Sequence, residues 1–154
     1  MQIVNQLTSF TCGLACIESL SADFNAPITQ CEMLIKYKER LIKDVPDFGD
    51  FGAARPALLE FIWQDLGFTG SWQKNNHDKT NVKESVFKTL KVNQSILIFC
   101  NFNKNSWHCI RFSCLKNDDT ISAMIPLFLE PSRIDDVSLQ NLIDWEFYYA
   151  IISN

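Results

Sequence analysis

The chain has 154 residues, of which 47% are hydrophobic and 21% charged, and its formal net charge is −4. This length predicts one domain with a hydrophobic core, and the negative charge argues against a nucleic-acid or anionic-membrane partner. The first residues carry no positive charge and no apolar run, so no Sec-type signal peptide is visible. No apolar run approaches the roughly 20 residues of a membrane span. We therefore expect a cytoplasmic protein with reduced cysteines, or one delivered into a target cell without a cleaved signal peptide.

Helical patterns dominate the first 91 residues. Helices are predicted over residues 12–24, 29–43, 55–66 and 81–91. The first follows from apolar residues that recur every four positions, the stripe of a buried helix. This stripe comprises Cys12, Cys16, Leu20 and Phe24. The second predicted helix begins at Thr29, and Glu32 three residues later completes a capping-box pattern. Its apolar residues occur near its start and near its end. They form its apolar face and comprise Leu34, Ile35, Leu41 and Ile42. Short strands are expected over residues 2–4 and 68–73, and loops over residues 44–53 and 74–79.

Strand patterns dominate the remainder of the chain. Strands are predicted over residues 95–100, 107–114, 120–129 and 146–153. A short helix is expected over residues 137–143, capped by Asp136. Helices followed by an antiparallel meander with one late helix predict an α+β fold.

The stretch over residues 6–20 centres on Cys12 and Gly13, at the predicted start of the first helix. Backbone N–H groups and the helix dipole favour negative charge there, which lowers a cysteine pKa. Cys12 is therefore a candidate nucleophile, and we expect iodoacetamide to label it first. Gly13 would let a substrate carbonyl approach the helix start without a Cβ clash.

A thiol nucleophile needs a base, and the chain has two histidines. His77 lies in a polar loop and is interpreted as a surface residue. His108 opens a strand after Trp107, where an imidazole is held by the sheet and can face a cleft. Such a histidine can accept the thiol proton and later protonate the leaving group. A half-buried strand residue with satisfied hydrogen bonds is the alternative interpretation of His108.

Gln6 precedes Cys12 by six residues. Its side-chain amide can donate to a developing oxyanion together with the backbone N–H of Cys12, although a polar surface residue is the alternative. Strand alternation turns Cys109 to the face opposite His108. The cysteines on strands are interpreted as core residues, and these are Cys100, Cys109 and Cys114. A disulfide or zinc pair of Cys12 with Cys16 stays open as an alternative.

Together these features resemble the papain-like cysteine peptidases, and most closely the C39 family, whose peptidase domains remove double-glycine leader peptides from bacteriocins. The residues that carry the resemblance are Gln6, Cys12, Gly13, Leu14, Ala15, Cys16, His108, Glu130 and Pro131. It covers nearly the whole chain, residues 1–154. It implies a papain-like fold in which a central Cys-bearing helix of an N-terminal helical half packs on an antiparallel sheet.

The resemblance also implies roles for single residues. These are nucleophile for Cys12, general base for His108, oxyanion donor for Gln6 and orienting acid for Glu130. The family has Asp before the Pro where this chain has Glu130. Other candidates for the orienting residue therefore stay open, and these are Asp118, Asp119 and Asn101.

The implied activity is that of a cysteine hydrolase acting on an amide bond, in the first place a C39-like peptidase with a protein or peptide substrate. One alternative is a bacterial effector or toxin of the same fold that deamidates a glutamine of a target protein or uses it for acyl transfer. Another is a non-catalytic papain-like binding module. An immunity or regulatory protein is a further conceivable partner. We expect no cofactor and no metal.

Overall fold

The computed structural model describes residues 1–8, 11–44, 56–74, 94–101, 107–117, 120–127, 129–138 and 147–154. Several sequence predictions lie outside these ranges. They are the loop over residues 45–53, the loop over residues 75–79 with His77, the helix over residues 81–91, and the residues Asp118 and Asp119.

The described helices are α1 (Cys12–Asp23), α2 (Gln30–Lys36), α3 (Lys38–Asp44) and α4 (Pro56–Asp65). The first and third predicted helices are confirmed, and Gly67, with φ of 91°, follows the third in the left-handed conformation that glycine favours. The capping box is confirmed, because Thr29 Oγ1 accepts the Glu32 N–H and the Glu32 carboxylate accepts the Thr29 N–H. The single helix predicted over residues 29–43 is wrong, since the chain turns at Tyr37 and forms two short helices.

The described strands are β1 (Gln73–Lys74), β2 (Gln94–Asn101), β3 (Trp107–Asn117), β4 (Thr120–Ile125), β5 (Arg133–Ser138) and β6 (Phe147–Ser153). They form one antiparallel sheet in the order β1-β6-β2-β3-β4-β5. The predicted α+β class with an antiparallel sheet is confirmed. The C-terminal strand β6 lies inside the sheet, between β1 and β2.

Three strand predictions need correction. Val137 and Ser138 belong to β5 and pair with Ile121 and Thr120 of β4, so the helix predicted over residues 137–143 is wrong at its start. Pairing with a neighbouring strand here overrides the local helical pattern. Residues 2–4 are assigned to no strand, and the strand predicted over residues 120–129 ends at Ile125. The strand predicted over residues 68–73 is reduced to a bridge at Thr69 and the start of β1.

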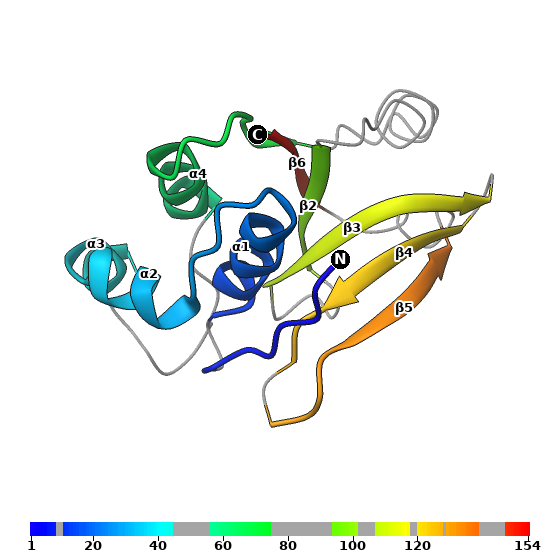
Figure 1. Ribbon diagram of the computed structural model, residues 1–154, viewed down its shortest axis with the longest axis horizontal. Coiled ribbons are helices and arrows are strands. Elements are labelled where there is room, and N and C mark those ends of the chain that lie inside the picture. Colours follow the sequence, from blue (N-terminus) through cyan, green and yellow to red (C-terminus); the bar gives the residue numbers. More distant parts are fainter. Residues whose placement is uncertain are drawn as a thin grey trace.

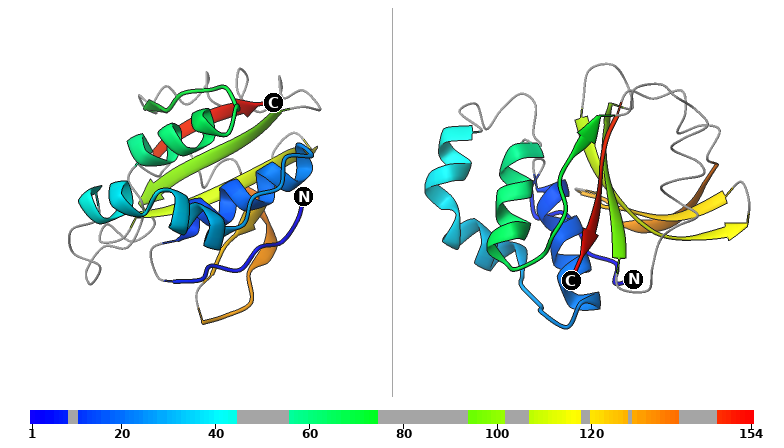
Figure 2. Two further views of the ribbon diagram at one scale, coloured as in Figure 1. Left: turned by 60° about the vertical axis from the view of Figure 1, so that its left-hand side comes forward. Right: turned by 90° about the horizontal axis from the view of Figure 1, so that it is seen from above.

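The described helices all lie on one side of the sheet, and α1 lies between the sheet and the other helices (Figures 1 and 2). The predicted stripe of α1 is buried on this side, with Cys12, Cys16 and Leu20 at most 1% exposed. Cys109 of β3 belongs to the same core cluster. A second cluster, which includes Cys100 and Ile110, lies on the opposite face of the sheet. The predicted packing of a central cysteine-bearing helix on an antiparallel sheet is thus confirmed.

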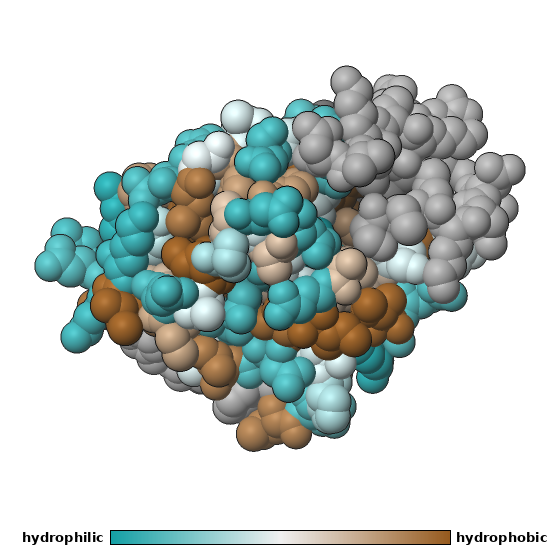
Figure 3. All heavy atoms as spheres, viewed as in Figure 1, coloured by the Kyte–Doolittle hydropathy of each residue, from teal (hydrophilic) through white to brown (hydrophobic). Residues whose placement is uncertain are grey.

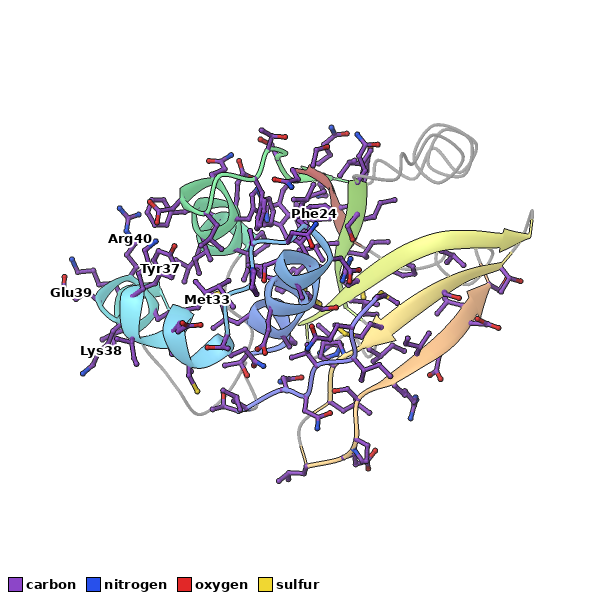
Figure 4. The ribbon with its side chains drawn as sticks, in the orientation of Figure 1. Phe24, Met33, Tyr37, Lys38, Glu39 and Arg40 are labelled. Carbon is purple, nitrogen blue, oxygen red and sulfur yellow. The ribbon has the colours of Figure 1, made fainter. Side chains whose placement is uncertain are left out.

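The turn at Tyr37 directs α3 toward α4. The Tyr37 hydroxyl donates to Asp65 at 2.8 Å, and the Arg40 guanidinium lies 3.7 Å from the centroid of the Phe61 ring. Figure 4 shows Met33 between α2 and α1, and Lys38 and Glu39 pointing away from the neighbouring helices.

The apolar face predicted for residues 29–43 is only partly correct. Leu41 is 2% exposed, whereas Ile35 is 78% and Ile42 is 49% exposed. Among the described residues, no helix is long and apolar enough to span a membrane.

Candidate active site

Cys12 is the first residue of α1 and is 1% exposed. Burial removes water from the thiol and raises the pKa of Cys12 to about 12, and the Cys109 thiol adds to this increase. The backbone N–H groups of Cys109, Gly13 and Cys12 act in the opposite direction. The helix start therefore has the expected influence on the thiol, but the lowered pKa predicted from it is wrong because desolvation is the larger effect.

Other thiols lie near Cys12, and of these Cys16 and Cys109 share its core cluster between α1 and the sheet, whereas Cys100 belongs to the cluster on the opposite face. Cys16 Sγ donates to the backbone carbonyl of Cys109 at 3.5 Å. A hydrogen bond between the side chains of Cys16 and Cys109, followed by burial, raises the pKa of Cys109. Burial also raises the pKa of Cys100, and the thiols of Cys109 and Cys12 contribute to that increase. Cys12 and Cys16 are both free thiols, so the alternative of a disulfide between them is not realised. No group of three or more His, Cys, Asp or Glu residues in the described ranges is placed to hold a metal ion.

His108 lies near the start of β3, directly opposite Cys100 of β2. Residues directly opposite one another share a face of a sheet, and Cys100 packs on the face away from α1. Burial lowers the pKa of His108, and a hydrogen bond to the Pro126 carbonyl partly opposes this effect. Cys12 meets β3 through the backbone of Cys109, one residue from His108. The structure thus brings the helix start to the histidine-bearing strand, but the described contacts of Cys12 do not include the imidazole.

Gln6 lies on the extended segment that leads into α1 and is 8% exposed. Its Nε2 donates to the Thr8 carbonyl at 2.8 Å, within the same segment. Thr11 fixes the approach to the helix, because its Oγ1 accepts the N–H groups of Leu7 and Thr8. Gln6 is therefore held before Cys12, as its spacing predicts, with its amide directed at its own loop.

Glu130 is exposed on the connection between β4 and β5. This connection is tied to the segment that carries Gln6, because Gln6 N–H donates to the Leu127 carbonyl at 3.1 Å. The Ser132 N–H also donates to Asn5 Oδ1 at 2.9 Å. Glu130 and Gln6 thus lie on connected segments, while the side chain of Asn101 lies outside the described residues.

Two contacts at the start of α1, of Cys12 with Cys109 and of Gly13 with Leu59, were not predicted from the sequence. Strand alternation predicts that Cys109 and His108 lie on different faces of the sheet, but it does not predict which face the first helix covers. A Cβ on Gly13 would lie 2.5 Å from Cδ1 of Leu59, a fully buried residue of α4. Gly13 therefore permits the close packing of α1 on α4, and Leu59 fills the space beside Gly13 that the sequence interpretation gives to a substrate carbonyl.

Comparisons with known proteins add little to this picture. No protein-family model matches the chain, and no curated protein matches it. Among solved structures, the chain is similar to the Pseudomonas avirulence protein AvrPphB, with 9% identity, coverage of 99% of this chain and 97% of that chain, and a TM-score of 0.47. An overlap of this quality does not distinguish a common family from a common arrangement of helices and strands. The resemblance to the C39 family therefore rests on the motif residues and stays a prediction.

Proposed function

We propose that the chain is a cysteine hydrolase that acts on an amide bond, with Cys12 as nucleophile and His108 as general base. The observation that carries this proposal is the contact between the start of α1 and the start of β3. The backbone N–H of Cys109 lies close enough to the Cys12 thiol to lower its pKa, and His108 is the preceding residue of the strand.

In the proposed reaction, the His108 imidazole accepts the Cys12 thiol proton, and the thiolate attacks the amide carbonyl carbon. The oxyanion accepts hydrogen bonds from the Cys12 N–H and the Gln6 side-chain amide. The imidazolium then protonates the leaving nitrogen as the C–N bond breaks, and water hydrolyses the thioester. Glu130 is the proposed partner that orients His108.

The described conformation requires an opening step before this reaction. Burial keeps the Cys12 thiol neutral, the Gln6 amide is bonded to the Thr8 carbonyl, and His108 pairs with Cys100, whose side chain packs on the face of the sheet away from α1. Substrate binding would therefore have to hydrate or reposition the thiol, release the amide and turn the imidazole. A C39-like peptidase is the first form of the proposal because the motif points to it. Deamidation of a glutamine or acyl transfer by a bacterial effector or toxin uses the same residues.

A second candidate function is a non-catalytic binding module of the same fold. The raised pKa of Cys12 favours it, because a neutral buried thiol is a poor nucleophile. The two candidates make different predictions for the same variants.

The test uses a synthetic bacteriocin leader peptide that ends in two glycines, followed by intact-mass analysis. A peptidase yields two fragments, and Cys12→Ala and His108→Ala should each reduce cleavage by at least about 100-fold. Cys31→Ala, which removes an exposed free thiol, is the matched control and should cleave normally.

In a parallel incubation, a glutamine-rich unfolded protein replaces the leader peptide. Deamidation converts a glutamine side chain of this protein into a glutamate, and the resulting gain in the mass of the protein reports it. Turnover that persists in Cys12→Ala would exclude the proposed nucleophile. Absence of turnover in both incubations, together with failure of a thiol-directed epoxide peptide to modify Cys12, would favour the binding module.

A further inference from the structure

A hollow lies between the N-terminal segment and the beginning of α2, with a volume of about 280 Å³. Ile3 and Leu7 line it and are 51% and 47% exposed. The N-terminal segment runs below α1 in Figure 1, and Figure 3 shows apolar patches separated by hydrophilic areas on this same face. The hollow therefore has apolar walls that are open to solvent.

Glu18 of α1 also lines the hollow and is half-buried. Its Oε2 accepts the backbone N–H of Gln30 at 2.9 Å and the Gln30 side-chain amide at 3.1 Å, and both donors are neutral. In the described ranges, Glu18 forms no ion pair, unlike Asp23, which pairs with Arg111. A carboxylate thus faces the hollow with its negative charge uncompensated by any described cation.

Gln30 connects Glu18 to the opposite wall. This side chain is 2% exposed, its Nε2 donates to the Asn5 carbonyl at 2.8 Å, and its Oε1 accepts the Leu7 N–H at 3.2 Å. The same amide therefore holds the carboxylate and the backbone of the N-terminal segment. A hollow whose walls are fixed in this way loses little conformational entropy when it is filled.

We propose that this hollow binds the arginine or lysine side chain of a partner polypeptide. The aliphatic stem of such a side chain suits the walls formed by Ile3 and Leu7, and its cationic end suits the carboxylate of Glu18. The net charge of −4 on the chain favours the approach of a basic partner. This site involves none of the proposed catalytic residues, so its failure would leave the thiol chemistry untouched.

The first test is an NMR titration of the ¹⁵N-labelled chain with Nα-acetyl-arginine amide and Nα-acetyl-lysine amide. Saturable shifts are expected at the Leu7 amide and the Gln30 side-chain amide. Nα-acetyl-citrulline amide has the shape of the arginine probe without its charge and should bind about ten-fold more weakly. Equal binding of citrulline and arginine, or shifts centred on another part of the chain, would overturn the proposal.

Variants then identify the carboxylate. Glu18→Gln keeps an oxygen that accepts the Gln30 donors and should abolish the preference for arginine over citrulline. Glu39→Gln makes the same change of charge at an exposed position of α3 and should retain the preference. Ile3→Ser alters an exposed wall residue without touching the carboxylate, and it should weaken the arginine probe about threefold. A preference that survives in Glu18→Gln, or unchanged binding in Ile3→Ser, would refute the assignment.

Discussion

At the scale of a single residue, the protonation of Cys12 is decided by the competition between its place on the helix and its burial. A helix terminus contributes about 0.3–1 kcal/mol to a charge at its end. The change in the pKa of Cys12 from 9.0 to about 12 corresponds to about 4 kcal/mol in favour of the neutral thiol. Desolvation therefore dominates, and a helix start makes a reactive cysteine only where water or a cation also reaches the sulfur.

Alkylation should reveal this balance directly. At pH 8, we expect iodoacetamide to modify Cys31, which is exposed, at least about 100-fold faster than Cys12 in the substrate-free protein. Peptide mapping by mass spectrometry at successive times gives both rates. Denaturation in urea should remove most of the difference. Rapid modification of Cys12 in the native protein would mean that the described conformation, in which Cys12 is buried, is not the main one in solution.

At the scale of elements, Arg111 holds α1 against the sheet. This side chain is 3% exposed, and its guanidinium donates to Ser95 at 2.9 Å, to Ser19 at 2.7 Å and to Asp23 at 2.7 Å. Ser95 lies on β2, whereas Ser19 and Asp23 lie on α1. One arginine of β3 thus fixes the helix that carries Cys12 relative to two strands.

Replacement of Arg111 should weaken this attachment. We expect Arg111→Ala to lower the free energy of unfolding by about 2–4 kcal/mol, because Asp23 loses a cationic partner and a buried volume is left empty. Urea denaturation followed by circular dichroism measures the change. Arg133→Ala breaks an exposed pair with Asp135 and should cost less than about 1 kcal/mol. Similar losses in the two variants would contradict the role given to Arg111.

The elements also show how far the sequence predicts the fold. The apolar stripe from Cys12 to Phe24 and the run of apolar residues in β2 gave the correct elements, because local periodicity reflects which side is buried. The start of the helix predicted over residues 137–143 was wrong because pairing with β4 decides the conformation of Val137. The position of Cys12 was predicted, but its burial depends on residues distant in the sequence, such as Cys109.

At the scale of the whole molecule, the buried ionisable groups limit the pH range of stability. At pH 7, His108 is neutral in the folded chain, since burial lowers its pKa below the ordinary value of 6.5. The unfolded chain binds a proton at this residue more readily than the folded chain does. Stability contributed by the neutral imidazole is therefore present above pH 6.5 and is lost as the pH falls toward the lower pKa of the folded state.

The thermal midpoint should follow this linkage. We expect it to decline between pH 7 and pH 5 more steeply in the native chain than in His108→Gln, which has no proton to take up at this position. His77→Gln, at a position interpreted from the sequence as a surface residue, is the control and should follow the native profile. Differential scanning calorimetry across this range provides the comparison. Parallel profiles for the native chain and His108→Gln would show that burial of the imidazole does not affect acid stability.

The position of β6 inside the sheet has a consequence for biosynthesis. The chain leaves the ribosome from its N-terminus, so β2, β3, β4 and β5 emerge before the strand that covers the free edge of β2. That edge runs over residues 94–100 and stays open until residues 147–153 arrive. A nascent chain in this state exposes unpaired backbone groups beside apolar side chains, a combination that favours aggregation and chaperone binding. The sheet is thus completed only at the end of the synthesis of the chain.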